Sequence, residues 1–148
     1  MRRFLLRLTI LTIAGLALGL TSCGEGKYAH VPETGATLEG TVTYKHEKVL
    51  VALVIVQGAD TPAATGFIDE DGRFKIVNVP LGEVNIAVNS DAGKGPLMSR
   101  AQSQAHTGSK TPLPKVIDIP AKYGSPNTSG ITTTIKKGEN EFNIVISE

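Results

Sequence analysis

The residues that could do chemistry are few and widely spaced. The chain of 148 residues has one cysteine, Cys23, and three histidines, His30, His46 and His106. Zinc needs several His, Cys or carboxylate ligands that converge, and a single cysteine allows neither a CxxC pair nor an internal disulfide. No GxSxG, GxxxxGKS/T or GxGxxG segment is present. The sequence predicts a protein that is not an enzyme and holds no cofactor.

Asp69 and Asp71 come nearest to a metal site, because Ca²⁺ prefers clustered carboxylate oxygens. Both belong to the segment Asp69-Glu70-Asp71-Gly72. The ligand spacing and the distal Glu of a calcium-binding loop are missing, whereas Asp followed by Gly is ordinary hairpin chemistry. We predict a turn here and no bound metal.

The first 22 residues have the pattern of a secretory signal. Arg2, Arg3 and Arg7 give a basic start, and residues 8–20 form an uncharged apolar run. This run has 13 residues, fewer than the about 20 that a membrane-spanning helix needs. An uncleaved membrane anchor or a buried helix is therefore the less favoured alternative.

The sole cysteine stands where such a signal would end. The segment Leu20-Thr21-Ser22-Cys23 resembles a bacterial lipobox, with Leu three residues before the cysteine and small residues between. The resemblance implies that Cys23 is lipidated on sulfur, becomes the new N-terminus and is acylated on nitrogen. Gly24, in place of Asp, favours the outer membrane by resemblance to enteric lipoproteins. The alternative is an ordinary signal peptide with a chance cysteine.

The chain is predicted to have three parts: a signal peptide over residues 1–22, a tether over 23–35 and a folded domain over 36–148. The formal net charge of the whole chain is +1. Without residues 1–22, 12 Lys and Arg remain against 14 Asp and Glu, so the remaining chain is slightly acidic. Binding to nucleic acid needs a clustered basic field, and we expect no nucleic-acid partner.

From residue 38 onward the apolar residues alternate with polar ones or form short bursts, as in β-strands. Seven or eight short strands in about 113 residues predict an all-β sandwich, with an open barrel as the alternative. No helix of ten residues or more is expected after residue 37. Tyr123 is predicted to close one end of the sandwich. The predicted strands cover residues 38–45, 49–56, 65–68, 73–77, 84–89, 116–119, 131–135 and 142–146.

The alternation of apolar and polar residues stops at residues 90–114, which are rich in Gly, Ser, Gln and Pro. We predict a long loop, and loops beyond about 12–15 residues are usually functional or disordered. One interpretation is a solvated insertion. The other is a partner-contact loop for a negatively charged partner, with Lys94, Arg100, Lys110 and Lys115 as its basic residues.

Several segments resemble the carboxypeptidase regulatory-like domains, which belong to the transthyretin-like (prealbumin-type) β-sandwiches. They are the Gly-x-Val strand at residues 38–43, the small-residue strand at 52–54, a DxDGxF hairpin at 69–76 and a VPxG turn at 79–83. The resemblance implies an Ig-like antiparallel sandwich of seven or eight strands. In carboxypeptidases such a domain accompanies a zinc catalytic domain and is not itself catalytic.

The segments at residues 119–131 and 138–142 resemble a tail found in small lipoproteins of planctomycete-type bacteria. Together these resemblances imply an exported lipoprotein, held by membrane lipid through Cys23 and facing the periplasm or cell exterior. Its sandwich would serve as a binding or structural module at the cell envelope, with an envelope protein or a glycan as partner. The alternative is a carrier of a small ligand or glycan.

Overall fold

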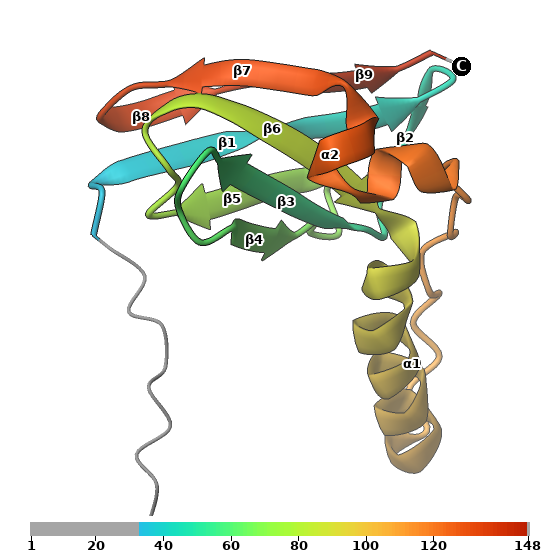
Figure 1. Cartoon of the computed structure of the whole chain (residues 1–148). Helices are drawn as coiled ribbons and strands as arrows, with labels where there is room; N and C mark the ends of the chain where they lie inside the picture. The colour runs from blue at the N-terminus through green and yellow to red at the C-terminus, as the bar shows by residue number, and fades with distance from the viewer. Residues whose placement is uncertain (1–32, 148) are drawn as a thin grey trace, which may run out of the picture.

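The computed structural model describes residues 33–147, which form a two-sheet β structure with one projecting helix (Figure 1). The predicted signal peptide, Cys23 and His30 lie outside the described residues. The helices of the described part are α1 (Ser90–Thr107), α2 (Pro126–Ser129) and a 3-10 turn (Ala121–Gly124). Its strands are β1 (Ala36–Tyr44), β2 (Glu47–Lys48), β3 (Leu53–Gly58), β4 (Ala64–Phe67), β5 (Arg73–Val77), β6 (Gly82–Asn89), β7 (Ile131–Ile135), β8 (Gly138–Glu141) and β9 (Ile144–Ile146).

The prediction of a mostly β fold built as a sandwich is confirmed. The inward residues of each strand alternate with outward ones, so that burial along β1 and β3 follows a period of two. Leu38 on β1, Val54 on β3 and Ile86 on β6 are all fully buried in one apolar cluster between the sheets. Tyr123 joins the same cluster, as its predicted packing role requires.

The first sheet, β4-β3-β6-β7, is antiparallel throughout. In the second sheet β1 is the central strand: it pairs antiparallel with β5 and β2 but parallel with β8 and β9. The expectation of a wholly antiparallel sandwich is therefore wrong for this sheet. Strands β8 and β9 follow β7 of the other sheet and are distant from β1 in the chain, so no hairpin, the connection that makes neighbouring strands antiparallel, joins them to β1.

A short interruption separates β8 from β9. Phe142 N donates to Glu39 O at 2.9 Å, and Asn143 Oδ1 accepts from Thr41 N at 3.0 Å. A Cβ atom on Gly40 would lie 2.0 Å from the Phe142 carbonyl oxygen, so only glycine fits at this point of β1. The strand predicted at 142–146 is therefore confirmed only for β9, whereas β8 is an additional strand formed mostly by residues expected to be a link.

The predicted turn at Asp69 is confirmed. Asp69 Oδ1 accepts from Asp71 N at 2.9 Å and from Arg73 N at 2.8 Å. Gly72 adopts a φ of 74°, which favours glycine. The carboxylate therefore caps the hairpin that leads into β5.

Two predicted strands are displaced. The apolar burst at 49–56 is a strand only from Leu53, because residues 49–52 cross from one sheet to the other, and three of these four residues are buried on the way. Residues 116–119 pair with no described strand and instead form an extended segment that returns beside α1. Ile119, at the end of this segment, packs into the core. Apolar residues in a buried crossing look like a strand in sequence, although they make no ladder.

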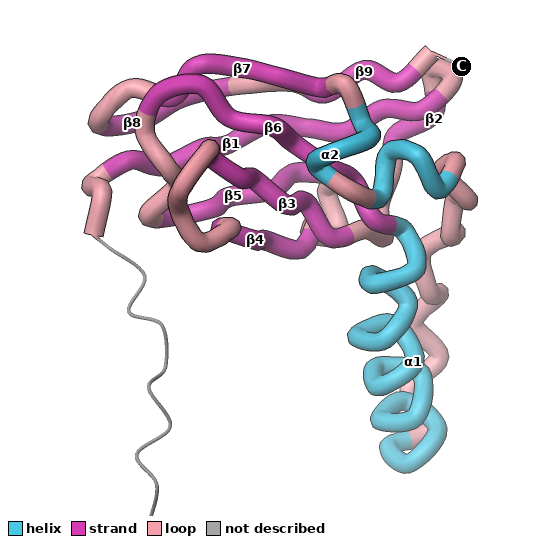
Figure 2. Tube along the Cα trace, in the orientation of Figure 1, coloured by secondary structure: helices cyan, strands magenta, loops and turns pink. Residues whose placement is uncertain are grey.

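The expected loop at 90–114 is instead mostly α1, an 18-residue helix (Figure 2). Asn89 Oδ1 caps its N-terminus by accepting from Ala92 N at 2.9 Å, and Gly108 ends it in the left-handed conformation with a φ of 69°. Only Ser90 and Gly93 are buried on this helix. Because α1 has no apolar stripe, hydrophobic periodicity could not reveal it. No helix within residues 33–147 has the length and apolar character needed to cross a membrane.

The end of the predicted tether is part of the fold. Thr34 Oγ1 donates to Val79 O at 2.7 Å, and Gly35 O accepts from Gly138 N at 3.1 Å. The chain is therefore fastened to the sandwich two residues before β1 begins.

Candidate functional site

The most distinctive surface feature is a projection formed by α1 and the return segment 108–118, which we call the arm (residues 90–118). In Figures 1 and 2 the helix leaves one end of the sandwich and runs away from it, and the return segment follows it back. Gly108 and the three residues from Ser109 to Thr111 form the reversal at the far end. Within the arm only Ser90 and Gly93 are buried, and all other residues are exposed or partly exposed.

The base of the arm sits on the sandwich through a backbone contact. A Cβ atom on Gly93 would lie 2.7 Å from Ala52 N and 2.8 Å from Ala52 Cα. Next to it, the buried Ser90 Oγ accepts from Ile119 N at 3.4 Å. Helix, crossing segment and return segment thus meet at a site where only a glycine fits.

Three of the four basic residues predicted for partner contact form ion pairs, two of them from α1. Lys94 Nζ contacts Asp91 at 2.7 Å and Asp118 at 3.1 Å, so it links α1 to the return segment at the base of the arm. Hydrogen bonds raise the pKa of Lys94 above its ordinary value, and the bond to Asp91 contributes more than the bond to Asp118. Arg100 forms an ion pair with Glu70.

The other two basic residues lie on the return segment. Lys115 pairs with Glu47 at 3.1 Å, although both side chains are exposed. Lys110 lies at the far end of the arm, exposed, and forms no ion pair within residues 33–147. The structure therefore distributes the four cations along the arm and does not gather them into one patch.

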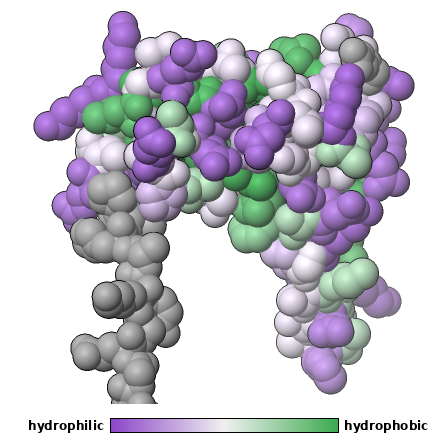
Figure 3. Space-filling view, in the orientation of Figure 1, coloured by the Kyte–Doolittle hydropathy of each residue, from purple (hydrophilic) through white to green (hydrophobic). Residues whose placement is uncertain are grey.

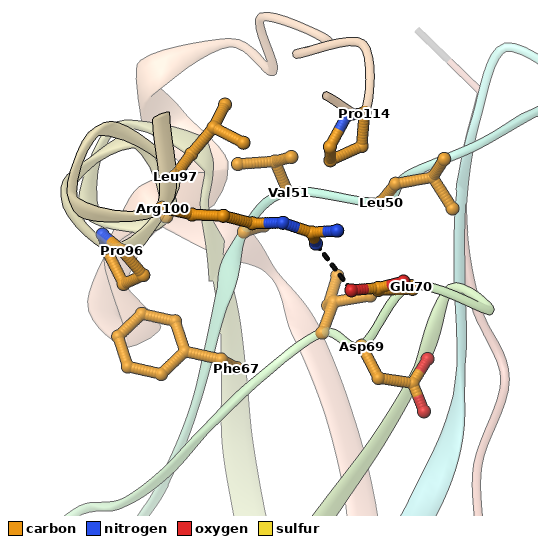
Figure 4. A pocket seen from close by; sticks show the side chains of 12 residues that line it. Leu50, Val51, Phe67, Asp69, Glu70, Pro96, Leu97, Arg100 and Pro114 are labelled. Carbon is orange, nitrogen blue, oxygen red and sulfur yellow. Dashed lines mark hydrogen bonds and ion pairs between the residues drawn. The ribbon is translucent and has the colours of Figure 1, made fainter. Parts of the chain in front are cut away.

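An apolar cleft of about 150 Å³ lies between the arm and the sandwich. In Figure 4 Arg100 reaches across it from α1 to Glu70. Phe67 is half exposed at its edge, and an apolar area fills the angle where the arm leaves the sandwich (Figure 3). Its remaining apolar lining includes Leu50, Val51, Pro96, Leu97 and Pro114.

Sequence reasoning missed this cleft, because its walls come from four segments far apart in the chain. One signal was present: Leu97 and Met98 are an adjacent apolar pair in an otherwise polar stretch. Leu97 faces the cleft and Met98 is exposed. A cleft lined in this way can accept a small apolar group, with Arg100 and Glu70 as polar contacts at its mouth.

A second depression, of about 590 Å³, lies on the outer face of the β1–β5–β8 sheet and is polar. Lys75 and Glu39 form an ion pair there, across neighbouring strands. The hydrogen bond and the negative charge of Glu39 raise the pKa of Lys75 above its ordinary value. Charges of both signs line this depression, so it presents no single-sign field to a ligand.

The described residues hold no group of three or more His, Cys, Asp or Glu side chains that could bind a metal ion. Asp71 and Asp69 belong to the hairpin turn, where Asp69 Oδ1 is used by two backbone amides. His46 and His106 are exposed on the β1–β2 turn and on α1.

Comparison of the sequence with models of known protein families finds no match, and no curated protein matches the chain.

Proposed function

We propose that this chain is an exported bacterial lipoprotein, anchored through Cys23, whose β-sandwich is a non-catalytic binding or structural module at the cell envelope. The observation that carries the proposal is the sole cysteine at the end of a basic and then apolar N-terminal run. Two or three acyl chains on one residue give stable membrane anchoring, because each buried CH₂ contributes about 0.8 kcal/mol. The outer membrane is the favoured destination of the exported protein.

The way in which the N-terminus joins the fold supports an anchoring role. Residues 37–39 of β1 pair with β5 on one side and with β8 on the other. A pull on the N-terminal segment therefore acts on a strand that is hydrogen-bonded along both edges. Thr34 adds a further bond to Val79 just before this strand.

We propose the transthyretin-like sandwich of carboxypeptidase regulatory-like domains as the specific fold. The DxDGxF hairpin and the VPxG turn support it, since the first forms the Asp69 turn and the second joins β5 to β6. In this proposal the ionised groups of the arm have a structural role, because Lys94, Arg100 and Lys115 hold the arm in place through ion pairs.

Replacement of the anchoring thiol tests the proposal. Cys23→Ser should move the protein from the membrane fraction to the soluble fraction and abolish incorporation of labelled palmitate. Ser22→Ala is the matched control, because it keeps a small residue before the cysteine and should leave both properties unchanged. Unaltered membrane association of Cys23→Ser would contradict the anchor.

The apolar cleft supports a second candidate, a carrier of a small apolar ligand. Its volume of about 150 Å³ is below the roughly 300–1,000 Å³ of common ligand pockets, so only a small group would fit. A ligand that binds only the native state raises the melting temperature. Stabilisation by a small apolar compound that is lost in Phe67→Ser would favour the carrier over the structural module.

A further inference from the structure

Charge is unequally divided between the arm and the rest of the fold. Residues 33–147 contain 11 Lys and Arg and 12 Asp and Glu. Residues 92–117 hold four of those cations and none of the carboxylates. The two carboxylates of the arm, Asp91 and Asp118, both lie at its base, where they pair with Lys94.

The far end of the arm is polar and carries positive charge only. We define the distal arm as residues 101–113, in which Lys110 is the one formally charged residue and His106 the one histidine. Both side chains are exposed. A surface of this kind meets no like-charge repulsion from a negatively charged layer.

The arm and the beginning of the described chain point to the same side. In Figure 1 the chain enters β1 from the side of the sandwich on which β4 and β5 lie, and α1 extends to that same side. Strands β7 and β9 form the opposite side. An anchor on the N-terminal segment would therefore place the membrane on the side to which the arm extends.

The lengths of the arm and of the N-terminal segment are compatible. The 18 residues of α1 rise about 27 Å at 1.5 Å each. The ten residues from Gly24 to Glu33 span at most about 35 Å when fully extended. The segment that follows the anchor therefore allows the sandwich to stand at the height at which the distal arm reaches the lipid headgroups.

We propose that the distal arm contacts the anionic lipid headgroups of the leaflet that holds the lipidated Cys23. This inference rests on the proposed anchoring. One lysine attracts an anionic surface only weakly, but the anchor makes the contact intramolecular and so raises the effective concentration of the membrane at the arm. The arm then acts as a spacer that keeps the sandwich away from the bilayer and fixes which side faces outward.

Lipid-to-protein quenching in vesicles tests the contact. The lipidated full chain, whose own Cys23 thiol is consumed, receives one new cysteine with a fluorophore, either Ser109→Cys on the distal arm or Val145→Cys on β9. Val145 is 73% exposed and belongs to β9, the strand that lies on the opposite side, so it is the matched control. Vesicles contain phosphatidylethanolamine, phosphatidylglycerol and a headgroup-quenching lipid. We expect strong quenching at position 109 and little at position 145, whereas equal quenching at both positions would overturn the proposal.

The charge dependence is tested in the same vesicles. Lys110→Gln should lower the arm–membrane association constant about fivefold, since it removes one cation, and Lys110→Arg should leave the constant unchanged. Replacing phosphatidylglycerol with phosphatidylcholine should weaken quenching at position 109 to a similar extent. If neither Lys110→Gln nor the removal of phosphatidylglycerol changed the quenching at position 109, the contact with anionic headgroups would be overturned.

Flotation of the protein with the vesicles separates the two proposals. A protein that floats but shows equal quenching at both labels refutes the arm contact alone. A protein that does not float refutes the anchor and the arm contact together.

Discussion

Gly93 lets the backbone of α1 touch the backbone of the sandwich at Ala52, where an added Cβ would lie within 2.8 Å of two main-chain atoms. Main-chain atoms cannot move aside as a flexible side chain can. We therefore predict that Gly93→Ala destabilises the protein by about 1–2 kcal/mol, the overpacking cost less the gain in helix propensity. The measurement is the free energy of unfolding in urea.

Gly95 provides the matched control, because a Cβ there meets nothing within 4 Å. The same substitution, Gly95→Ala, should stabilise the helix by up to about 1 kcal/mol. Equal effects of the two substitutions would show that the arm is not packed on the sandwich through Gly93.

Lys94 gives the arm a pH dependence. Hydrogen bonds to Asp91 and Asp118 raise its pKa above the ordinary lysine value of 10.5. A raised pKa in the folded state means that the stabilisation is complete below the unfolded value and is lost as the pH rises through the folded value. Melting temperatures measured from about pH 8 to 12 should therefore fall less steeply for Lys94→Gln than for the natural chain.

Lys75 serves as the reference for that measurement, since its pKa is also raised, by Glu39. Lys75→Gln should change the alkaline slope without affecting hydrogen exchange in α1, whereas Lys94→Gln should speed exchange there. Identical exchange in the two variants would contradict the role of Lys94 at the base of the arm.

At the scale of elements, α1 depends on its caps more than on burial. Asn89 satisfies a backbone amide of the first turn at 2.9 Å, and such a cap contributes about 1 kcal/mol. We predict that Asn89→Ala increases hydrogen exchange in α1 while amides of β6 before Asn89 keep their protection. A general loss of protection in β6 would mean that the arm and the sandwich unfold as one unit.

The sequence predicted those elements whose burial repeats at a regular period. Strands β1, β5 and β6 were recognised because inward residues such as Leu38, Phe74 and Ile86 alternate with polar ones. Helix α1 was missed because it buries only Ser90 and Gly93 and so has no apolar stripe for hydrophobic periodicity to reveal. The crossing at 49–52 was misread as strand, because burial makes a segment apolar whether or not it forms a ladder.

At the scale of the whole molecule, the parallel pairing of β8 and β9 with β1 joins residues about 100 positions apart. Nothing local in either segment encodes that pairing, so the sequence predicted strands at β1 and β9 but neither β8 nor this sheet. The apolar cleft was missed for the same reason. By contrast, the candidate anchor is a contiguous motif, and sequence alone was sufficient to predict it.

A partner of the module can be captured in native cells by lysine crosslinking followed by mass spectrometry. Lys110 is exposed at the far end of the arm, so we expect its crosslinks to include the amine-bearing headgroups of phosphatidylethanolamine. Recurrent crosslinks from Lys94 or Lys115 to one envelope protein would identify a protein partner. Crosslinks confined to this chain would favour the small-ligand carrier.

The central claim is the lipid anchor, and the most direct measurement is tandem mass spectrometry of the N-terminal peptide of the protein purified from membranes. We predict a peptide that begins at Cys23, with a diacylglyceryl group on its sulfur and an acyl group on its nitrogen. A mature peptide that starts elsewhere, or one with an unmodified Cys23 thiol, would contradict the account.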